Sequence, residues 1–153
     1  MAYEHIFRIY VHKLVVAVFM QLTQFTDYSL RTLLYLAEHK ERLSTIDEIA
    51  QWYGVSKAHL VKVVHNLVKL GYIKSTQGKG GGIQLNKKPS EISIGQIVRA
   101  TEPNFHLVEC FDKENNTCRI THNCKLQHVL GEATKRFFDV VDKHTLESIS
   151  STH

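Results

Sequence analysis

Residues 46–70 read IDEIAQWYGVSKAHLVKVVHNLVKL, and this stretch decides the fold. Its first part predicts a short helix over 46–53, because Asp47 and Glu48 stand in the first turn, where the helix dipole favours negative charge. Gly54 ends that helix. The second part predicts a helix over 57–70, since apolar residues recur at helical spacing: Leu60, Val63, Val64, Leu67 and Leu70. Two short helices joined by a Gly-containing turn are typical of a helix-turn-helix, although two packed helices of any small bundle would show the same periodicity.

Charge is distributed unevenly along this chain of 153 residues. No Asp or Glu lies between positions 49 and 90, whereas acidic residues outnumber Lys and Arg from 101 to 153. The lysines of the acid-free stretch are Lys57, Lys62, Lys69, Lys74, Lys79, Lys87 and Lys88. A basic half beside a mildly acidic half indicates that one half neutralises DNA phosphates. A solvated lysine face is the alternative interpretation.

Two strand-like runs, 72–76 and 83–85, flank a glycine-rich turn and predict a hairpin wing. This turn is not a phosphate-binding P-loop, because Lys79 is followed by Gly80 instead of Ser or Thr and no helical pattern comes next. Its bare backbone amides can approach a phosphate or a minor groove, although a plain tight hairpin is equally compatible. The residues that we expect to contact double-stranded DNA are Ser56, Lys57, His59, Lys62, Lys79 and Gly80.

The remaining segments complete the predicted layout. Residues 1–19 read as an extension upstream of a true start at Met20, and the longest uncharged run, residues 14–26, is too short to span a membrane. A helix capped by Thr26 or Asp27 runs to 39–42, and another covers 93–100. We therefore expect a mainly helical fold with a small β wing: a winged helix-turn-helix domain over 20–100, a loop over 101–125 and a long helix over 126–146.

All three cysteines of the chain, Cys110, Cys118 and Cys124, lie in one short stretch of the 101–125 loop. Three thiolates can converge on one point if the polar residues between them loop out, and iron-sulfur clusters and zinc both select thiolates. An odd count argues against a disulfide framework. The alternatives are structural zinc with a histidine as fourth ligand, three unrelated cysteines, or a nucleophile made of Cys110 and His106. The histidines near the cysteines are His106, His122 and His128.

The long C-terminal helix carries an apolar stripe that a small domain does not need for its own core. The stripe comprises Leu126, Val129, Leu130, Ala133, Phe137, Val140 and Val141. Packing against the same helix of a second chain would bury it, and a two-fold homodimer would present two recognition helices to a palindromic site. The alternative is a helix that folds back on its own domain.

Four segments resemble the NsrR family of nitric-oxide-sensing repressors, which belongs to a wider group of winged-helix dimers that includes IscR. They are MQLTQFTDYSLR at 20–31, YGVS at 53–56, KGGGI at 79–83, and CRIT at 118–121 leading to Cys124. The resemblance runs from 20 to about 149. It implies a cytoplasmic transcriptional repressor without catalytic activity, whose iron-sulfur cluster reacts with nitric oxide and releases operator DNA.

The resemblance also implies a ligand set for the cluster. Cys110, Cys118 and Cys124 would hold a 4Fe-4S cluster, or alternatively a 2Fe-2S cluster, and Asp27 of the other subunit would be the fourth ligand. Asp27 can instead be an ordinary residue of a helix N-terminus. His122 and His128 are alternative fourth ligands, because they lie close to the cysteines in the sequence. This sequence departs from IscR at two points. The gap between Cys110 and Cys118 is longer than in IscR, and Gln127 stands where IscR has its histidine ligand. A zinc-stabilised DNA-binding protein and an iron-sulfur regulator of cluster assembly are the alternative functions.

Overall fold

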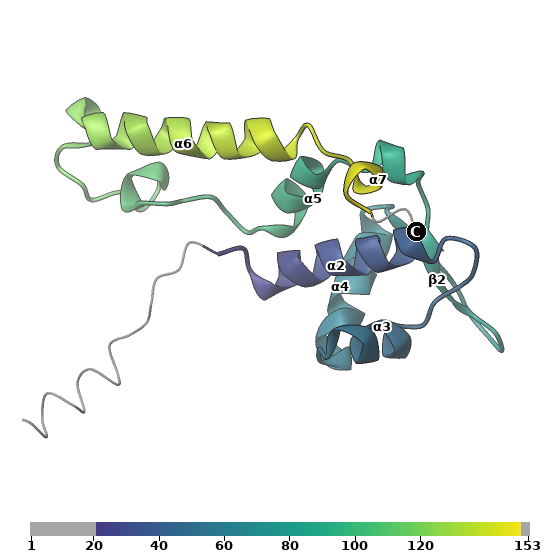
Figure 1. Cartoon of the computed structure of the whole chain (residues 1–153). Coiled ribbons are helices and arrows are strands. Elements are labelled where there is room, and N and C mark those ends of the chain that lie inside the picture. The colour runs from purple at the N-terminus through teal and green to yellow at the C-terminus, as the bar shows by residue number, and fades with distance from the viewer. Residues whose placement is uncertain (1–20, 151–153) are drawn as a thin grey trace, which may run out of the picture.

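Helix α2 (Gln24–Glu38) is the element on which the N-terminal half is assembled (Figure 1). The computed structural model describes residues 21–150, so the predicted extension at 1–19 lies outside the described residues. The helix begins earlier than predicted, because the hydroxyl of Thr23 accepts a hydrogen bond from the Thr26 amide and caps it. Thr26 and Asp27 therefore lie inside the first turn and do not cap the helix.

The helix-turn-helix has the predicted form. Helix α3 (Ile46–Tyr53) starts at Thr45, whose side chain forms a reciprocal capping box with Glu48. Gly54 ends α3 with a φ of 62°, a left-handed conformation that glycine adopts without steric cost. Helix α4 (Lys57–Lys69) follows after a short turn and ends one residue earlier than predicted. Its buried face consists of Leu60, Val63, Val64 and Leu67.

The predicted wing is an antiparallel pair of strands, β1 (Ile73–Thr76) and β2 (Gly82–Leu85), in which Ile73 pairs with Leu85. Ile83 also pairs with Ser44 through two backbone hydrogen bonds of 2.8 and 3.0 Å, so the segment before α3 is fixed to the wing. A Cβ at position 82 would lie only 2.7 Å from the carbonyl oxygen of Ser44. Glycine is therefore required at this position for the close approach of the two backbones.

The core lies between α2, α4, the wing and α5 (Ile94–Thr101), which follows the short 3-10 helix η1 (Pro89–Glu91). Leu33, Ile73 and Ile97 are among its fully buried side chains. Small polar residues of α2 are buried as well. Ser29 and Thr32 donate hydrogen bonds to the carbonyl oxygens four residues earlier, at 2.7 Å each, which satisfies their hydroxyls inside the core.

The C-terminal half contains two 3-10 turns, η2 (Glu109–Phe111) and η3 (Thr121–Asn123), and the long helix α6 (Lys125–Val141). Figure 1 shows α6 running along one side of the molecule, with the loop that carries η2 beneath its N-terminal half. No helix among residues 21–150 combines the length and the apolar character that a membrane span requires.

Helix α6 ends at Val141, and the prediction that it continues to 146 is wrong. Thr145 caps a new short helix, α7 (Leu146–Ile149), and the chain turns back onto the N-terminal domain. The amide of Ile94 donates to His144 and the amide of Leu146 donates to Ile92, at 3.0 and 2.8 Å. These long-range hydrogen bonds and the complete burial of Leu146 stop α6 from continuing.

Candidate functional site

The residues predicted to contact DNA lie at two exposed places. Ser56, Lys57, His59 and Lys62 are exposed in the first turns of α4 and just before it, whereas Lys79 and Gly80 are exposed at the tip of the wing. Ser56 is the N-cap residue of α4, yet its side chain makes no capping hydrogen bond. The Ser56 hydroxyl is therefore available to an external group such as a phosphate oxygen.

Two of these residues make contacts inside the domain. The ammonium group of Lys57 lies 2.7 Å from a carboxylate oxygen of Asp47, so an ion pair to α3 offsets part of its charge. The His59 ring lies 6.3 Å from the ring of Tyr28 on α2. At the wing tip, the amide of Gly81 donates to the carbonyl of Gly78 at 2.9 Å, and Gly80 has a φ of 81°. This tight turn leaves the Lys79 side chain pointing into solvent.

The three cysteines occupy one loop in front of α6. Cys110 lies in η2, Cys118 lies in the irregular segment between the two 3-10 turns, and Cys124 is the N-cap residue of α6. All three are half-buried, and none of them forms a disulfide. Within residues 21–150 no three His, Cys, Asp or Glu side chains converge closely enough to hold a metal ion. A single chain therefore supplies soft thiol donors on one loop, without gathering them at one point.

Short-range hydrogen bonds hold this loop together. Glu109 accepts the hydroxyl of Thr117 at 2.6 Å, and this hydrogen bond lowers the pKa of the Glu109 carboxyl. The hydroxyl of Thr121 donates to the carbonyl of Cys118 at 2.8 Å. Gln127, in the first turn of α6, donates to the carbonyl of Cys110 at 3.3 Å. These partners all lie between positions 109 and 127, so the hydrogen bonds join this part of the loop to itself and to the first turn of α6.

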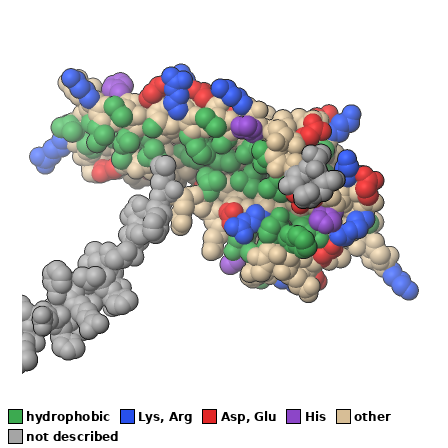
Figure 2. Space-filling model, viewed as in Figure 1, with side chains coloured by type: hydrophobic (Ala, Val, Ile, Leu, Met, Phe, Trp, Pro, Cys, Tyr) green, Lys and Arg blue, Asp and Glu red, His purple; other side chains and the backbone are tan. Residues whose placement is uncertain are grey.

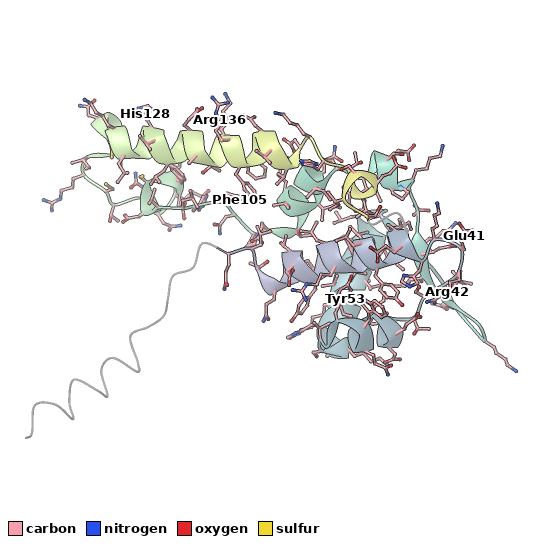
Figure 3. All side chains as sticks on the ribbon, in the orientation of Figure 1. Glu41, Arg42, Tyr53, Phe105, His128 and Arg136 are labelled. Carbon is pink, nitrogen blue, oxygen red and sulfur yellow. The ribbon has the colours of Figure 1, made fainter. Side chains whose placement is uncertain are left out.

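The candidate fourth ligands lie in different surroundings. Asp27, in the first turn of α2, is paired with Arg31: the two carboxylate oxygens lie 3.0 and 2.9 Å from the guanidinium nitrogens Nε and Nη2. About 41% of the Asp27 side chain is exposed. His122 and His128 are both exposed, and Figure 3 shows His128 on the outer side of α6, away from α2.

The apolar stripe of α6 remains largely uncovered by its own chain. Helix α6 has no fully buried residue, and Leu126, Val129 and Val140 are 62%, 63% and 57% exposed. Figure 2 shows this apolar surface as a band along the helix. Only the C-terminal part of α6 packs on the domain, where Phe138 meets Phe105 edge to face with ring centres 4.7 Å apart. The predicted alternative of a helix folded back on its domain therefore describes only that end of α6.

Sequence reasoning missed two links between the halves of the chain. Arg99 on α5 forms a bidentate ion pair with Asp142 just after α6, with one nitrogen–oxygen distance of 2.8 Å, and its guanidinium lies 3.9 Å from the Phe138 ring centre. This ion pair lowers the pKa of the Asp142 carboxyl. Glu102 accepts the amide and hydroxyl of Thr23 at 2.6 and 3.1 Å. No local sequence signal could have revealed pairs so far apart in the chain.

Comparison with known proteins agrees with this architecture. The HTH-type transcriptional regulator NsrR of Bacillus subtilis strain 168 is 49% identical over 131 residues, which cover 85% of this chain and 90% of that protein. The structure of CymR, described as the global cysteine regulator of B. subtilis, has a TM-score of 0.67 at 27% identity and covers 88% of this chain and 98% of CymR.

A structure of IscR from T. potens has a TM-score of 0.68 at 25% identity, covering 87% of this chain and 88% of that one. Residues 22–152 match the family model called Rrf2, described as an iron-dependent transcriptional regulator. The winged helix-turn-helix, the cysteine loop and the long helix thus occur together in a chain that belongs to the Rrf2 family of iron-dependent transcriptional regulators.

Proposed function

We propose that this protein is a homodimeric repressor that binds an iron-sulfur cluster through Cys110, Cys118 and Cys124 and releases operator DNA when nitric oxide reaches the cluster. The observation that carries the proposal is the placement of three half-buried, unpaired thiols on one loop next to α6, in a chain with an exposed recognition helix. Thiolates are the usual donors to such clusters. The similarity to NsrR proteins supports nitric oxide as the signal.

The dimer follows from the exposed stripe of α6. A soluble protein rarely leaves a contiguous band of large apolar side chains in water, and a second copy of the same helix would cover it. A two-fold arrangement makes the two contact surfaces identical and presents two copies of α4 to a palindromic operator. Ser56, Lys57, His59 and Lys62 would then contact one DNA half-site, and Lys79 and Gly80 would add contacts from the wing.

The three thiols leave one iron of a 4Fe-4S cluster without a cysteine donor, and we propose that Asp27 of the partner subunit fills that place. Its carboxylate is half-exposed and, among residues 21–150, is held only by Arg31 one turn further along the same helix, so it can change partners without disturbing the core. An oxygen ligand is a poorer match to iron than a thiolate. When bound, the cluster supplies iron that reacts with nitric oxide, and a weakly held position makes that iron accessible.

A test of this function starts with protein purified without oxygen. We expect a brown protein with visible absorption, containing iron and sulfide, that binds its operator in a gel-shift assay and loses binding on addition of nitric oxide. Cys110→Ala, Cys118→Ala and Cys124→Ala variants should each remain dimeric but bind operator weakly. A colourless protein that contains zinc would support the zinc alternative, and operator binding by a triple cysteine variant at the level of the parent would refute the proposal.

The fourth ligand has a separate test. Asp27→Ala should keep a cluster on the three cysteines while changing its visible spectrum and its rate of reaction with nitric oxide. His122→Ala and His128→Ala are the matched controls, because both histidines lie close to the cysteines in sequence. If either histidine variant changes these properties and Asp27→Ala matches the parent, the assignment of Asp27 is wrong.

A further inference from the structure

The first two turns of α4 carry two exposed apolar side chains among their basic ones. Ala58 and Val61 are both exposed, and 45% of Val61 is accessible. Because they are three residues apart, they lie side by side on one face of the helix, with Lys62 next to them. The core-facing side of α4 is formed by Leu60, Val63, Val64 and Leu67. Neither Ala58 nor Val61 therefore contributes to the folded core.

The position of this pair indicates what could cover it. The N-terminal turns of a recognition helix are the part that enters the major groove, where lysines reach phosphates and other side chains meet the base edges. The apolar group that the major groove offers is the C5 methyl of thymine, and alanine-sized or branched aliphatic side chains contact it. Lys57 and Lys62 flank the pair. Asp47 on α3 offsets part of the Lys57 charge, but no acidic residue follows α3 until after position 90, so the surroundings are suited to DNA.

We propose that Ala58 and Val61 read thymine methyl groups and thereby make T·A base pairs preferred at fixed positions of each operator half-site. This inference rests on the proposed binding of DNA through α4 and adds to it the bases that the helix selects. A cytosine at the same place would present its amino group to an apolar side chain that cannot accept a hydrogen bond, which disfavours that base.

The chain provides a matched control on the same helix. Val68 has the same side chain and is 36% exposed, but it lies two turns further from the N-terminus of α4. If the exposed valines only contributed general apolar contact with DNA, Val61 and Val68 would behave alike. If the N-terminal turns read bases, only Val61 should discriminate between them.

The test separates the methyl group from every other feature of the base pair. Wild-type protein first selects a duplex from a random pool, and this duplex is then made with deoxyuridine in place of thymidine at one position at a time. Deoxyuridine lacks only the C5 methyl group. Affinity is measured for the wild type, Val61→Ala and Val68→Ala at one salt concentration. We expect about a fourfold loss for each contacted methyl with the wild type, the effect of removing one methyl-sized apolar contact.

The expected pattern is specific to Val61. At one thymine of each half-site, the loss caused by deoxyuridine should disappear in Val61→Ala and persist in Val68→Ala, while a neighbouring thymine read by Ala58 stays sensitive in both. Uniform tolerance of deoxyuridine by the wild type overturns the proposal, as does Val61→Ala with unchanged sensitivity at every thymine. Either result leaves operator binding itself intact, whereas a wild type that selects no duplex at all would refute the proposed DNA binding.

Discussion

Replacing Leu146 by Ala should destabilise the protein far more than its place near the C-terminus suggests. Leu146 is fully buried, although it belongs to a helix of only four residues. Removing a buried leucine side chain costs about 2 to 5 kcal/mol, depending on how well the site can collapse. Backbone hydrogen bonds to Ile92 and Ile94 hold the segment on both sides, which limits collapse. We therefore expect a loss of about 3 kcal/mol, a large part of the about 5 to 15 kcal/mol of a typical domain.

Urea unfolding followed by circular dichroism measures this loss directly. Wild type and Leu146→Ala are compared at the same protein concentration, so that the proposed dimer contributes equally to both measurements. The midpoint should fall while the slope stays constant, and the melting temperature should drop by about 10 °C. Ile149→Ala is the matched control, since this residue of the same helix is 43% exposed. Its truncation should cost less than about 1 kcal/mol.

The comparison between the two variants decides whether α7 is docked on the domain. If Leu146→Ala and Ile149→Ala have the same small effect, the C-terminal segment does not pack as described, and the fixed placement of the end of α6 is refuted. If only Leu146→Ala is destabilised, α6 is anchored to the DNA-binding domain through the segment that follows it.

Two further predictions concern charge. Lys62→Ala and Lys79→Ala should each reduce the slope of log affinity for operator against log salt by about one unit per lost phosphate contact, whereas Lys135→Ala on α6 should not; equal slopes in all three variants would contradict the assigned surface. Hydrogen bonds from Arg42, which has the larger effect, and from Tyr35 lower the pKa of the Glu48 carboxyl from 4.5 to about 2. The ionised carboxylate therefore stabilises the fold above pH 4.5, and this stabilisation is lost as the pH falls toward 2. The stability difference between wild type and Glu48→Gln should therefore shrink over this range in acid unfolding measurements, and a constant difference would show that the ionised carboxylate does not contribute.

Local patterns were sufficient for the helix-turn-helix. The spacing of Leu60, Val63, Val64 and Leu67 specified the buried face of α4, and Gly54 marked the turn before it, because helix periodicity and left-handed turns are encoded by neighbouring residues. The start of α2 was misplaced since Thr26 and Asp27 are also residue types that cap helices, and Thr23 is favoured by its bonds to Glu102, which is distant in sequence. The end of α6 was misplaced for the same reason: backbone hydrogen bonds to Ile92 and Ile94 fix the turn into α7.

The candidate site shows the same division between local and distant information. Sequence alone located the thiols on one loop and the lysines in one acid-free stretch, since both can be read from residues close together in the chain. It gave no indication of the links from Thr23 to Glu102 and from Arg99 to Asp142. Both links lie at the C-terminal end of α5: Glu102 joins it to the N-cap residue of α2, and Arg99 joins it to the residue that follows α6. The hydrogen bonds of Glu109, Thr121 and Gln127 stay within positions 109–127, so a chemical change at the thiols would act first on this stretch and on the first turn of α6, which it joins.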